Sequence, residues 1–194
     1  MLGLMMDRPL LVSDLLRHAE RHHGATEIVT KKVDGGIHRY TYREAHARAR
    51  KLANALKRLG VEPQDRVATL AWNTHRHFEI YYAVAGSGAV IHTINPRLFP
   101  DQIRYIGNHA EDKVVFYDRT FAPLVEKIKA KARTVQHWIA LGDPYEELLA
   151  AESDRYEWPS FDERTAACLC YTSGTTGRIT SRAEMLIASG SAEA

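Results

Sequence analysis

The sequence has 194 residues, of which 45% are hydrophobic and 26% are charged, with 12 glycines. This composition is typical of a soluble globular protein and excludes the collagen-like, fibrous and disordered classes. Lys and Arg number 26 against 24 Asp and Glu, so the formal net charge of +2 points to neither nucleic acid nor an anionic membrane surface as a partner. A chain of this length buries roughly 70% of the surface that its unfolded form exposes, which is enough for one full core or for a large core with a small appendage.

The sequence also bears on membranes and on the redox environment. The longest apolar stretch, residues 81–91, is interrupted by Gly86 and Gly88 and is far shorter than the ~20 residues that span a bilayer. MLGLMMDRPLLVSD has no basic segment before its apolar residues, so we expect no secretory signal. Cys168 and Cys170 lie two positions apart on a predicted strand, where a disulfide would be strained. We therefore expect a reducing cytoplasm, and apolar packing rather than metal binding by the cysteines.

The N-terminal part of the sequence predicts two helices separated by a β-hairpin. Ser13 and Gly24 enclose a short amphipathic run as its expected N-cap and C-cap. Two β-rich runs, TEIVTKK and IHRYT, flank an Asp-Gly-Gly turn, which predicts a hairpin. Thr41 and Glu44 have the spacing of a capping box at the start of a second helix, which should end at Gly60.

After the second helix, short apolar runs alternate with amphipathic ones. In chain order the predicted strands are RVATLA, AVIHTI, KVVFYD, VQHWIAL and AACLCY, and the predicted helices between them cover residues 75–85, 100–109, 121–132 and 145–151. The strand at 114–117 is apolar on both faces, as in a parallel sheet covered by helices on each side. We therefore predict an α/β fold with a mostly parallel sheet flanked by helices, after an early β-hairpin. Residues 152–164 are expected to form a surface connection.

The stretch most informative about function, YTSGTTG from Tyr171 to Gly177, follows the last predicted strand. Its two glycines let the backbone turn tightly so that its N–H groups face one point, and its Ser and Thr hydroxyls supply further donors. Such a nest suits phosphate oxygens, although ordinary surface loops have similar compositions and that alternative stays open on the residues alone. Arg178 follows Gly177, so the G-x-x-x-x-G-K-[ST] pattern of a P-loop NTPase is not met.

YTSGTTG resembles the phosphate loop of the acyl-adenylate-forming superfamily, which includes the acyl-CoA synthetases. Residues 88–118, GAVIHTINPRLFPDQIRYIGNHAEDKVVFYD, resemble the corresponding part of medium- and long-chain fatty acyl-CoA synthetases, as do RVATLAWNTHRHFEIYYAV and TVQHWIAL. The resemblance extends over about residues 10–177. It implies a reaction in which a fatty acid and ATP give acyl-AMP and pyrophosphate, after which the thiol of coenzyme A displaces AMP.

The resemblance also implies which residues bind ATP. Contacts to the triphosphate are expected from Thr172, Ser173, Gly174, Thr175, Thr176 and Gly177. Thr172 is the hydroxyl expected to join the Mg²⁺ shell, but Mg²⁺ prefers six oxygens, so one hydroxyl cannot hold the ion unaided. The family's carboxylate partner for magnesium and its adenylation lysine are expected downstream of this sequence, so we expect no catalytic residue on this chain.

The sequence departs from the family pattern directly after the loop. The family continues T-G-x-P-K-G, whereas this chain reads TGRITS from Thr176 to Ser181. We therefore expect residues 1–177 to be a partial N-terminal domain and residues 178–194 a divergent tail that is disordered or non-native. Such a chain should be inactive or nearly so by itself. The alternative is a short, non-catalytic paralogue that binds nucleotide or pairs with a full-length synthetase.

Other polar and aromatic residues have structural interpretations. His18 and His22 lie one helical turn apart beside arginines and lack the H-E-x-x-H order, which favours a solvated polar face over a zinc site. His92 lies mid-strand, where packing or hydrogen bonding is expected. A core is favoured, with an acyl-chain wall as the alternative, for Phe78, Tyr81, Tyr82 and Val84. Because some relatives pair through their N-terminal domains and truncation would bare apolar surface, we expect a homodimer or a larger species.

Overall fold

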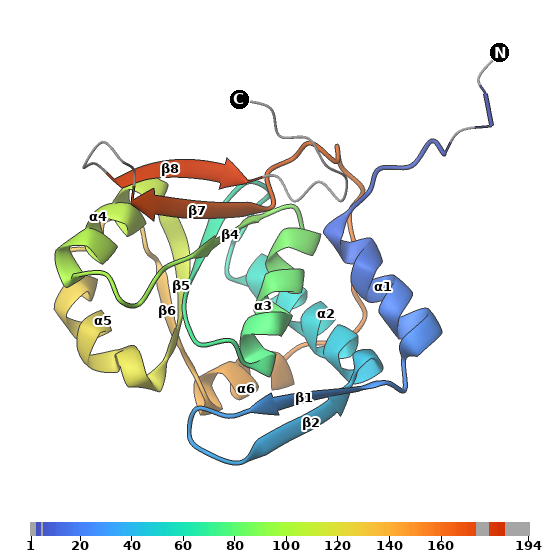
Figure 1. Ribbon diagram of the computed structural model, residues 1–194, viewed down its shortest axis with the longest axis horizontal. Helices are drawn as coiled ribbons and strands as arrows, with labels where there is room; N and C mark the ends of the chain where they lie inside the picture. The colour runs from blue at the N-terminus through green and yellow to red at the C-terminus, as the bar shows by residue number, and fades with distance from the viewer. Residues whose placement is uncertain (1–2, 5, 174–178, 185–194) are drawn as a thin grey trace.

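A six-stranded sheet forms the centre of the computed structural model, which describes residues 3–4, 6–173 and 179–184 (Figure 1). In spatial order the strands are β6 (His137–Leu141), β5 (Asp112–Asp118), β3 (Arg66–Leu70), β4 (Val90–Thr93), β7 (Cys168–Ser173) and β8 (Ile179–Glu184). The first five are mutually parallel, and β8 pairs antiparallel with β7. The predicted α/β fold with a mostly parallel sheet is therefore confirmed.

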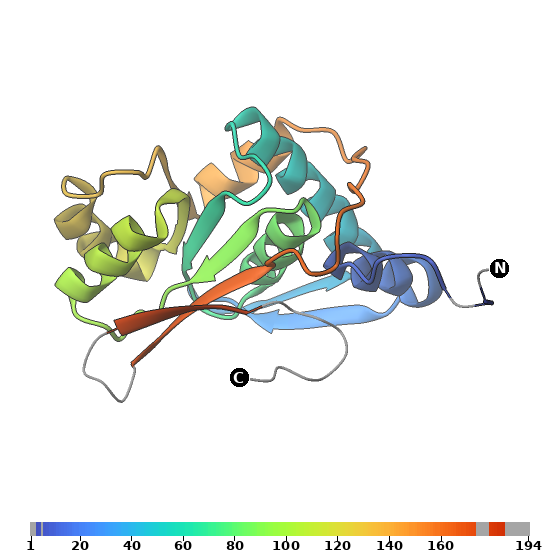
Figure 2. The ribbon, with the colours of Figure 1, turned by 90° about the horizontal axis from the view of Figure 1, so that it is seen from above.

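Helices cover both faces of the sheet (Figures 1 and 2). One layer consists of α4 (Pro100–Ala110) and α5 (Ala122–Lys129), with the short 3-10 turn η1 (Arg119–Phe121) before α5. The other consists of α1 (Val12–His23), α2 (Tyr42–Arg58), α3 (His75–Gly86) and α6 (Asp143–Ala150). Because neighbouring residues of a strand point to opposite faces, Phe116 packs beneath α6 and Val115 faces α4 and α5. The strands therefore divide the interior into two apolar cores.

The predicted β-hairpin is present as a separate two-stranded sheet of β1 (Glu27–Lys31) and β2 (Ile37–Thr41). Gly35 and Gly36 form the turn with φ values of 91° and 78°, a region that L side chains rarely adopt. The predicted capping box at the start of α2 is confirmed: the Glu44 amide donates to Thr41 Oγ1 at 3.3 Å, and the Thr41 amide donates to Glu44 Oε2 at 2.7 Å. Local sequence signals thus fix this junction.

The predicted N-cap of the first helix is wrong. The N-cap of α1 is Leu11, and Ser13 lies inside the first turn with its side chain buried. Within the described part of the chain, Ser13 Oγ has no hydrogen-bond partner. Ser13 is directed at α3, because a Cβ built on Gly86 would lie 3.4 Å from the Ser13 Cβ. Packing between the two helices therefore overrides the capping preference of serine.

Part of the predicted tail forms a strand. Residues 179–184 pair with β7 in a register that runs from Cys168 opposite Glu184 to Ser173 opposite Ile179. The outer edge of β7 offers a row of backbone N–H and C=O groups, which any extended segment can pair with regardless of family pattern. Residues 185–194 lie outside the described residues, and the expected boundary at residue 177 with a divergent, disordered or non-native tail stays a prediction.

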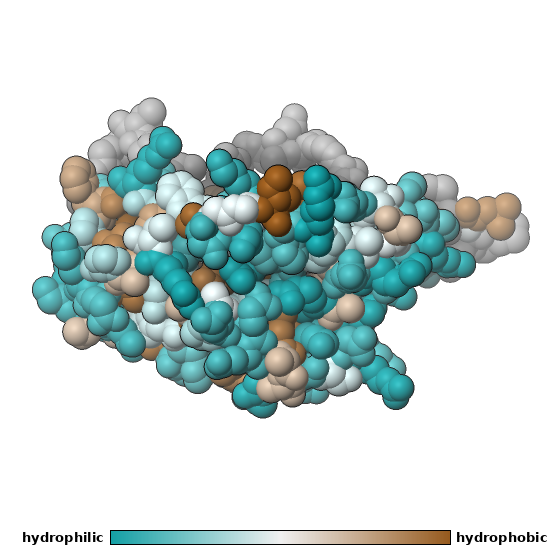
Figure 3. All heavy atoms as spheres, turned by 90° about the horizontal axis from the view of Figure 1, so that it is seen from below, coloured by the Kyte–Doolittle hydropathy of each residue, from teal (hydrophilic) through white to brown (hydrophobic). Residues whose placement is uncertain are grey.

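The described surface is largely polar. Figure 3 shows one face on which hydrophilic residues predominate and hydrophobic residues are scattered among them. Among the helices that the structure describes, none has the length and apolar character needed to cross a membrane. The aromatic set predicted to be core is confirmed, since Val84 is buried and Phe78, Tyr81 and Tyr82 pack against the core beneath α3.

Candidate functional site

The predicted phosphate loop begins at the carboxyl end of β7. Tyr171, Thr172 and Ser173 are the last residues of this strand, while 174–178 lie outside the described residues, as do the side chains from residue 172 onward. Thr172 pairs with Thr180 across to β8, so the five residues between the strands link two antiparallel neighbours. In open α/β sheets, ligands bind beyond the carboxyl ends of the parallel strands. This location suits a ligand site, while the predicted contacts of the loop residues stay predictions.

The start of β7 is fixed to the parallel sheet. Cys168 and Leu169 pair with Ile91 and His92 of β4, and the Ile91 amide donates to the Ala167 carbonyl at 3.0 Å. Beyond these two pairs, β7 diverges from β4 and, with β8, crosses over the end of the sheet (Figure 1). The end of β7 is paired with β8, and side-chain contacts connect it to the rest of the sheet.

Tyr171 supplies such a contact. Its hydroxyl lies 2.6 Å from Nδ1 of His109, near the end of α4, and its ring centroid is 5.1 Å from that of His92. Burial, with a smaller contribution from the Asp112 carboxylate, raises the pKa of Tyr171 to about 12. The phenol is therefore protonated at neutral pH, and it shares a hydrogen bond with Nδ1 of His109. The residue that opens the loop motif is thus bonded to α4.

A buried histidine and carboxylate lie beneath Tyr171. His92 and Asp112 are both fully buried, and Nδ1 of His92 is 2.9 Å from each carboxylate oxygen of Asp112. Burial raises the pKa of Asp112, an effect that His92 opposes. Among the described residues, none hydrogen-bonds with Nε2 of His92. The pair links β4 to β5 across β3, so the expectation of hydrogen bonding for His92 is confirmed.

Polar groups also gather at the carboxyl ends of β3 and β5. The Trp72 amide donates to Asp118 Oδ2 at 2.6 Å, and the Trp72 indole donates to Thr120 Oγ1 at 3.1 Å. Burial raises the pKa of Asp118, while the Trp72 amide acts to lower it. The chain runs from β3 to β4 on one side and then returns to β5 on the other, which makes this edge a topological switch point. Sequence analysis did not identify these residues, which no local motif marks.

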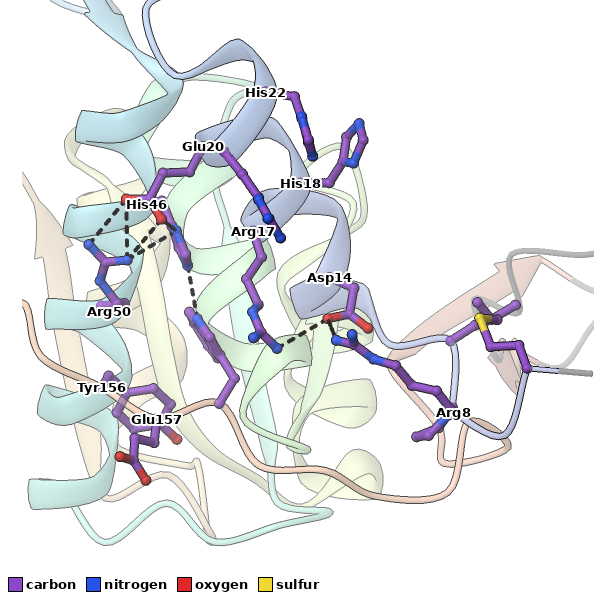
Figure 4. Close-up of a pocket in the computed structure, with 15 residues that line it drawn as sticks. Arg8, Asp14, Arg17, His18, Glu20, His22, His46, Arg50, Tyr156 and Glu157 are labelled. Atoms are coloured by element: carbon purple, nitrogen blue, oxygen red, sulfur yellow. Dashed lines mark hydrogen bonds and ion pairs between the residues drawn. The ribbon is translucent and has the colours of Figure 1, made fainter.

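A separate hollow of about 700 Å³ lies between α1, α2 and residues 156–158 (Figure 4). Asp14 accepts from Arg8 at 2.6 Å and from Arg17 at 3.3 Å, while Glu20 lies 2.6 Å from Nδ1 of His46. These contacts already engage Asp14 and Glu20. In the described ranges, no group of three or more His, Cys, Asp or Glu is placed to hold a metal ion.

The two histidines predicted to form a polar face lie at this hollow. His18 and His22 are exposed on α1 and lie beside each other (Figure 4). Their ring centroids are 4.5 Å apart. Both rings extend from the helix toward solvent, so the interpretation as a polar face is confirmed. We find no arrangement here that resembles a reaction centre, and the carboxyl end of β7 remains the candidate functional site.

Comparisons with known proteins bear on the family of the chain. The family model described as "AMP-binding enzyme" matches residues 15–179, which includes the loop motif. The chain is 51% identical over 190 residues to a 3-methylmercaptopropionyl-CoA ligase of Ruegeria lacuscaerulensis, covering 91% of this chain and 35% of that protein. It is 47% identical over 190 residues to a medium-chain-fatty-acid–CoA ligase of Ectopseudomonas oleovorans, with the same coverage.

Solved structures of other proteins share the fold of this chain. The inhibitor-bound N-terminal domain of FACL13 from Mycobacterium tuberculosis superposes with a TM-score of 0.76 at 29% identity, covering 88% of this chain and 43% of that one. An anthranilate CoA ligase, AuaEII, in complex with anthranoyl-AMP shares the fold with a TM-score of 0.81 at 22% identity, covering 91% and 34%. The chain spans about a third of the length of the curated relatives given above.

Proposed function

Because the chain belongs to the AMP-binding enzyme family, we propose that it carries the ATP-phosphate strand and loop of an AMP-forming fatty acyl-CoA ligase. The observation that carries this proposal is the position of the YTSGTTG motif, which begins at the carboxyl end of β7 with Tyr171 bonded to α4. In this reaction the fatty acid carboxylate attacks the α-phosphorus of ATP and pyrophosphate leaves. The thiol of coenzyme A then displaces AMP from the acyl-AMP.

The proposed role of the loop is electrostatic. Backbone N–H groups and hydroxyls between Thr172 and Gly177 would hold the β- and γ-phosphates and stabilise the charge that develops on the departing pyrophosphate. Donors that are held in place before the reaction require little reorganisation during it. The bond from Tyr171 to His109 supports such a role, because it fixes the backbone one residue before the first proposed phosphate contact.

Magnesium is a separate part of the proposal. When bound, Mg²⁺ would neutralise phosphate charge, and Thr172 is our proposed protein ligand for it. Mg²⁺ prefers six oxygen ligands, often including carboxylates, and the described part of the chain places no cluster of three or more acidic, His or Cys side chains together. The described residues therefore do not form a complete site for the ion, and we assign no step to it.

The acid, the compartment and the assembly are further proposals. The relatives carry names that include medium-chain fatty acid, long-chain fatty acid and 3-methylmercaptopropionyl, and we propose a fatty acid as the carboxylate substrate. We propose a cytoplasmic protein, which is supported by the two cysteines being thiols. We also propose a homodimer or larger species, supported by an apolar groove that includes the exposed Leu10 and Leu15 beside Tyr81 and Tyr82. A monomer found by light scattering at micromolar concentration would contradict the proposed self-association.

The phosphate-loop proposal is tested by a chimera. Residues 1–177 of this chain would replace the matching N-terminal part of the medium-chain ligase of E. oleovorans, and ATP–pyrophosphate exchange would be measured with medium- and long-chain acids. We expect exchange that falls by about ten- to a thousandfold when Thr172 and Thr175 are both changed to Val, the range seen when a preorganised donor is removed. A folded chimera without exchange, or one indifferent to these substitutions, would contradict the proposal.

The 194-residue chain itself is tested beside the chimera. We expect it to show little or no exchange, because it supplies only the strand and loop of the proposed site. Calorimetry with Mg-ATP then separates two forms of the proposal. Tight binding without exchange would favour a non-catalytic nucleotide-binding paralogue, and absence of both binding and exchange would favour an inert portion of a longer ligase. Robust turnover by this chain would contradict its assignment as inactive.

A further inference from the structure

The two cysteines of the sequence form a close pair on β7. The Sγ atoms of Cys168 and Cys170 are 3.6 Å apart, and both residues are thiols. Residues two positions apart on a strand point to the same face, so the backbone itself places the two sulfur atoms side by side. Cys168 is buried against the core beneath α3, whereas Cys170 is half-buried.

The distance between the sulfur atoms suits chelation and does not suit a disulfide. A disulfide requires the sulfur atoms to approach to about 2.05 Å, and neighbouring positions on one strand meet this geometry only with strain. Two thiolates bound to a single tetrahedral ion at about 2.3 Å each lie ~3.8 Å apart. The observed separation of 3.6 Å is close to that second value. One atom can therefore bridge the pair with little movement of the backbone.

The side chains around Cys168 and Cys170 limit which kind of atom can bridge the two sulfur atoms. Two hydroxyls lie beside the pair: Thr93 Oγ1 is 3.6 Å from Sγ of Cys170, and the Tyr81 hydroxyl hydrogen-bonds with Cys168. A hydroxyl is a weak ligand for a soft ion. Among the side chains that the structure describes, which end at residue 171, no third His, Cys, Asp or Glu joins the pair as a ligand group. A closed structural zinc site needs four ligands. The pair therefore matches a thiophilic centre that needs two sulfur ligands and brings its own third substituent.

We propose that Cys168 and Cys170 form a chelating site for a trivalent organoarsenical. The hydrated arsenical R–As(OH)₂ reacts with both thiols, forming two As–S bonds and breaking two As–O bonds. Each thiol proton leaves with one hydroxide, so two waters are released. Arsenic stays trivalent and no electron is transferred, so no oxidant or reductant is needed. The site is independent of the proposed ligase function, because both thiols lie before the loop.

The site is tested on the 194-residue chain with phenylarsine oxide, followed by intact-mass spectrometry. We expect one phenylarsenic group per chain, retained against excess monothiol and removed by a dithiol such as ethanedithiol. Since the sequence has no cysteine besides Cys168 and Cys170, a bidentate adduct on a single chain can lie only at this pair. The absence of an adduct, or a mass that shows arsenic bridging two chains, would overturn the proposal.

Matched variants assign the adduct to the pair. We expect Cys170→Ala, at the half-buried position, to lose the resistance to monothiol, and Cys168→Ala to do the same while circular dichroism confirms folding of each. We also expect the folded chain to keep its arsenical at about tenfold higher dithiol concentration than the chain unfolded in urea, because the strand holds both sulfur atoms in place. Retention by Cys170→Ala, or no difference between the folded and unfolded chains, would overturn the proposal.

Discussion

The hydroxyl of Tyr145 donates to Oε2 of Glu79 at 2.8 Å, in a part of the core where Glu79 is completely buried. The other carboxylate oxygen of Glu79 accepts from Nε of Arg48 at 2.8 Å. Arg48 reaches on to Glu146 at 2.9 Å, which also accepts from Arg76 at 2.8 Å. Burial raises the pKa of Glu79, and Arg48 opposes that effect. These bonds join α2, α3 and α6.

The buried carboxylate predicts a large effect of removing its cationic partner. Arg48→Met should lower the free energy of unfolding by about 3–5 kcal/mol, because it leaves a buried charge without compensation. Tyr145→Phe should cost about 1–3 kcal/mol, the penalty for a buried acceptor that loses one donor. Urea unfolding at neutral pH measures both. Arg39→Met is the control, since its ion pair with Glu27 is exposed and contributes about 0–1 kcal/mol. Equal losses for Arg48→Met and Arg39→Met would contradict this account.

A histidine stack predicts how stability depends on pH. His75 is buried and its ring stacks on that of His38 with centroids 3.8 Å apart. Burial, then His38 and the nearby arginines Arg76 and Arg48, lower the pKa of His75 to about 3, while Glu146 opposes them. In the unfolded chain a histidine titrates near about 6.5. The unfolded state therefore binds more protons between these values, so His75 stabilises the fold above about pH 6.5 and loses that contribution as pH falls.

The prediction is checked by measuring the unfolding free energy against pH and comparing the slope of the wild type with that of His75→Gln. Each such histidine changes the unfolding free energy by up to about 1.4 kcal/mol per pH unit, so His75→Gln should flatten the decline between about pH 7 and about pH 5. Buried carboxyls with raised pKa values, such as Asp112, act with the opposite sign, and comparison of variants cancels them. His22→Gln, at an exposed position, should keep the wild-type slope. An unchanged slope in His75→Gln would refute the prediction.

The contact between Tyr171 and His109 predicts local protection of β7. Tyr171→Phe removes the hydrogen bond between the Tyr171 hydroxyl and Nδ1 of His109 and should cost about 0.5–1.5 kcal/mol. Because 1.4 kcal/mol is a factor of ten, amide hydrogen exchange over residues 168–173 should accelerate about fivefold. Tyr105→Phe is a matched control, since the Tyr105 ring also stacks on His109 but the residue is 52% exposed. Equal exchange rates in the two variants would contradict a holding role for the Tyr171 hydroxyl.

Gly86, at the end of α3, packs so close to Trp158 that the effect of Gly86→Ala on stability should change sign when Trp158 is removed. Gly86→Ala in a helix normally adds about 0.5–1 kcal/mol of stability. Here a Cβ would lie 2.8 Å from the Trp158 ring, which is held by its indole bond to Nε2 of His46 at 2.9 Å. We expect Gly86→Ala to cost about 1–3 kcal/mol in the wild type and to be neutral or stabilising with Trp158→Ala. Thermal unfolding of the four proteins measures the cycle, and additivity would argue against this clash.

The elements were predictable from the sequence, and their spatial order was not. The alternation of apolar and amphipathic runs, with residues 114–117 apolar on both faces, predicted the parallel sheet. Which strands become neighbours depends on how the crossover helices pack, and no local pattern shows that β5 lies on the far side of β3 from β4. The cap at Thr41 was predictable because its partner is three residues away. Ser13 was misassigned because its packing partner, Gly86, is distant in sequence.

The candidate site also has one part that the sequence could indicate and another that it could not. The loop motif is contiguous, so its resemblance to the family's phosphate loop could be seen in residues 171–177 alone, and its role in binding phosphate stays a proposal. The bonds that hold the loop's strand join residues far apart: Tyr171 to His109 over 62 positions and His92 to Asp112 over 20. No spacing rule links such pairs before the strand order is known. A polar residue inside an apolar strand, as at His92, was the only local sign that a partner existed.

The late position of β7 in the chain has a consequence for synthesis on the ribosome. Strands β3 to β6 emerge before it, and domains begin to fold as the chain is made. Until residue 168 arrives, the outer edge of β4 presents unpaired N–H and C=O groups beside Ile91 and His92, which are fully buried in the finished structure. An open apolar edge is a template for pairing with another chain. The strand that leads into the loop therefore also closes the nascent sheet, and the interval before its arrival is when misassociation is most favoured.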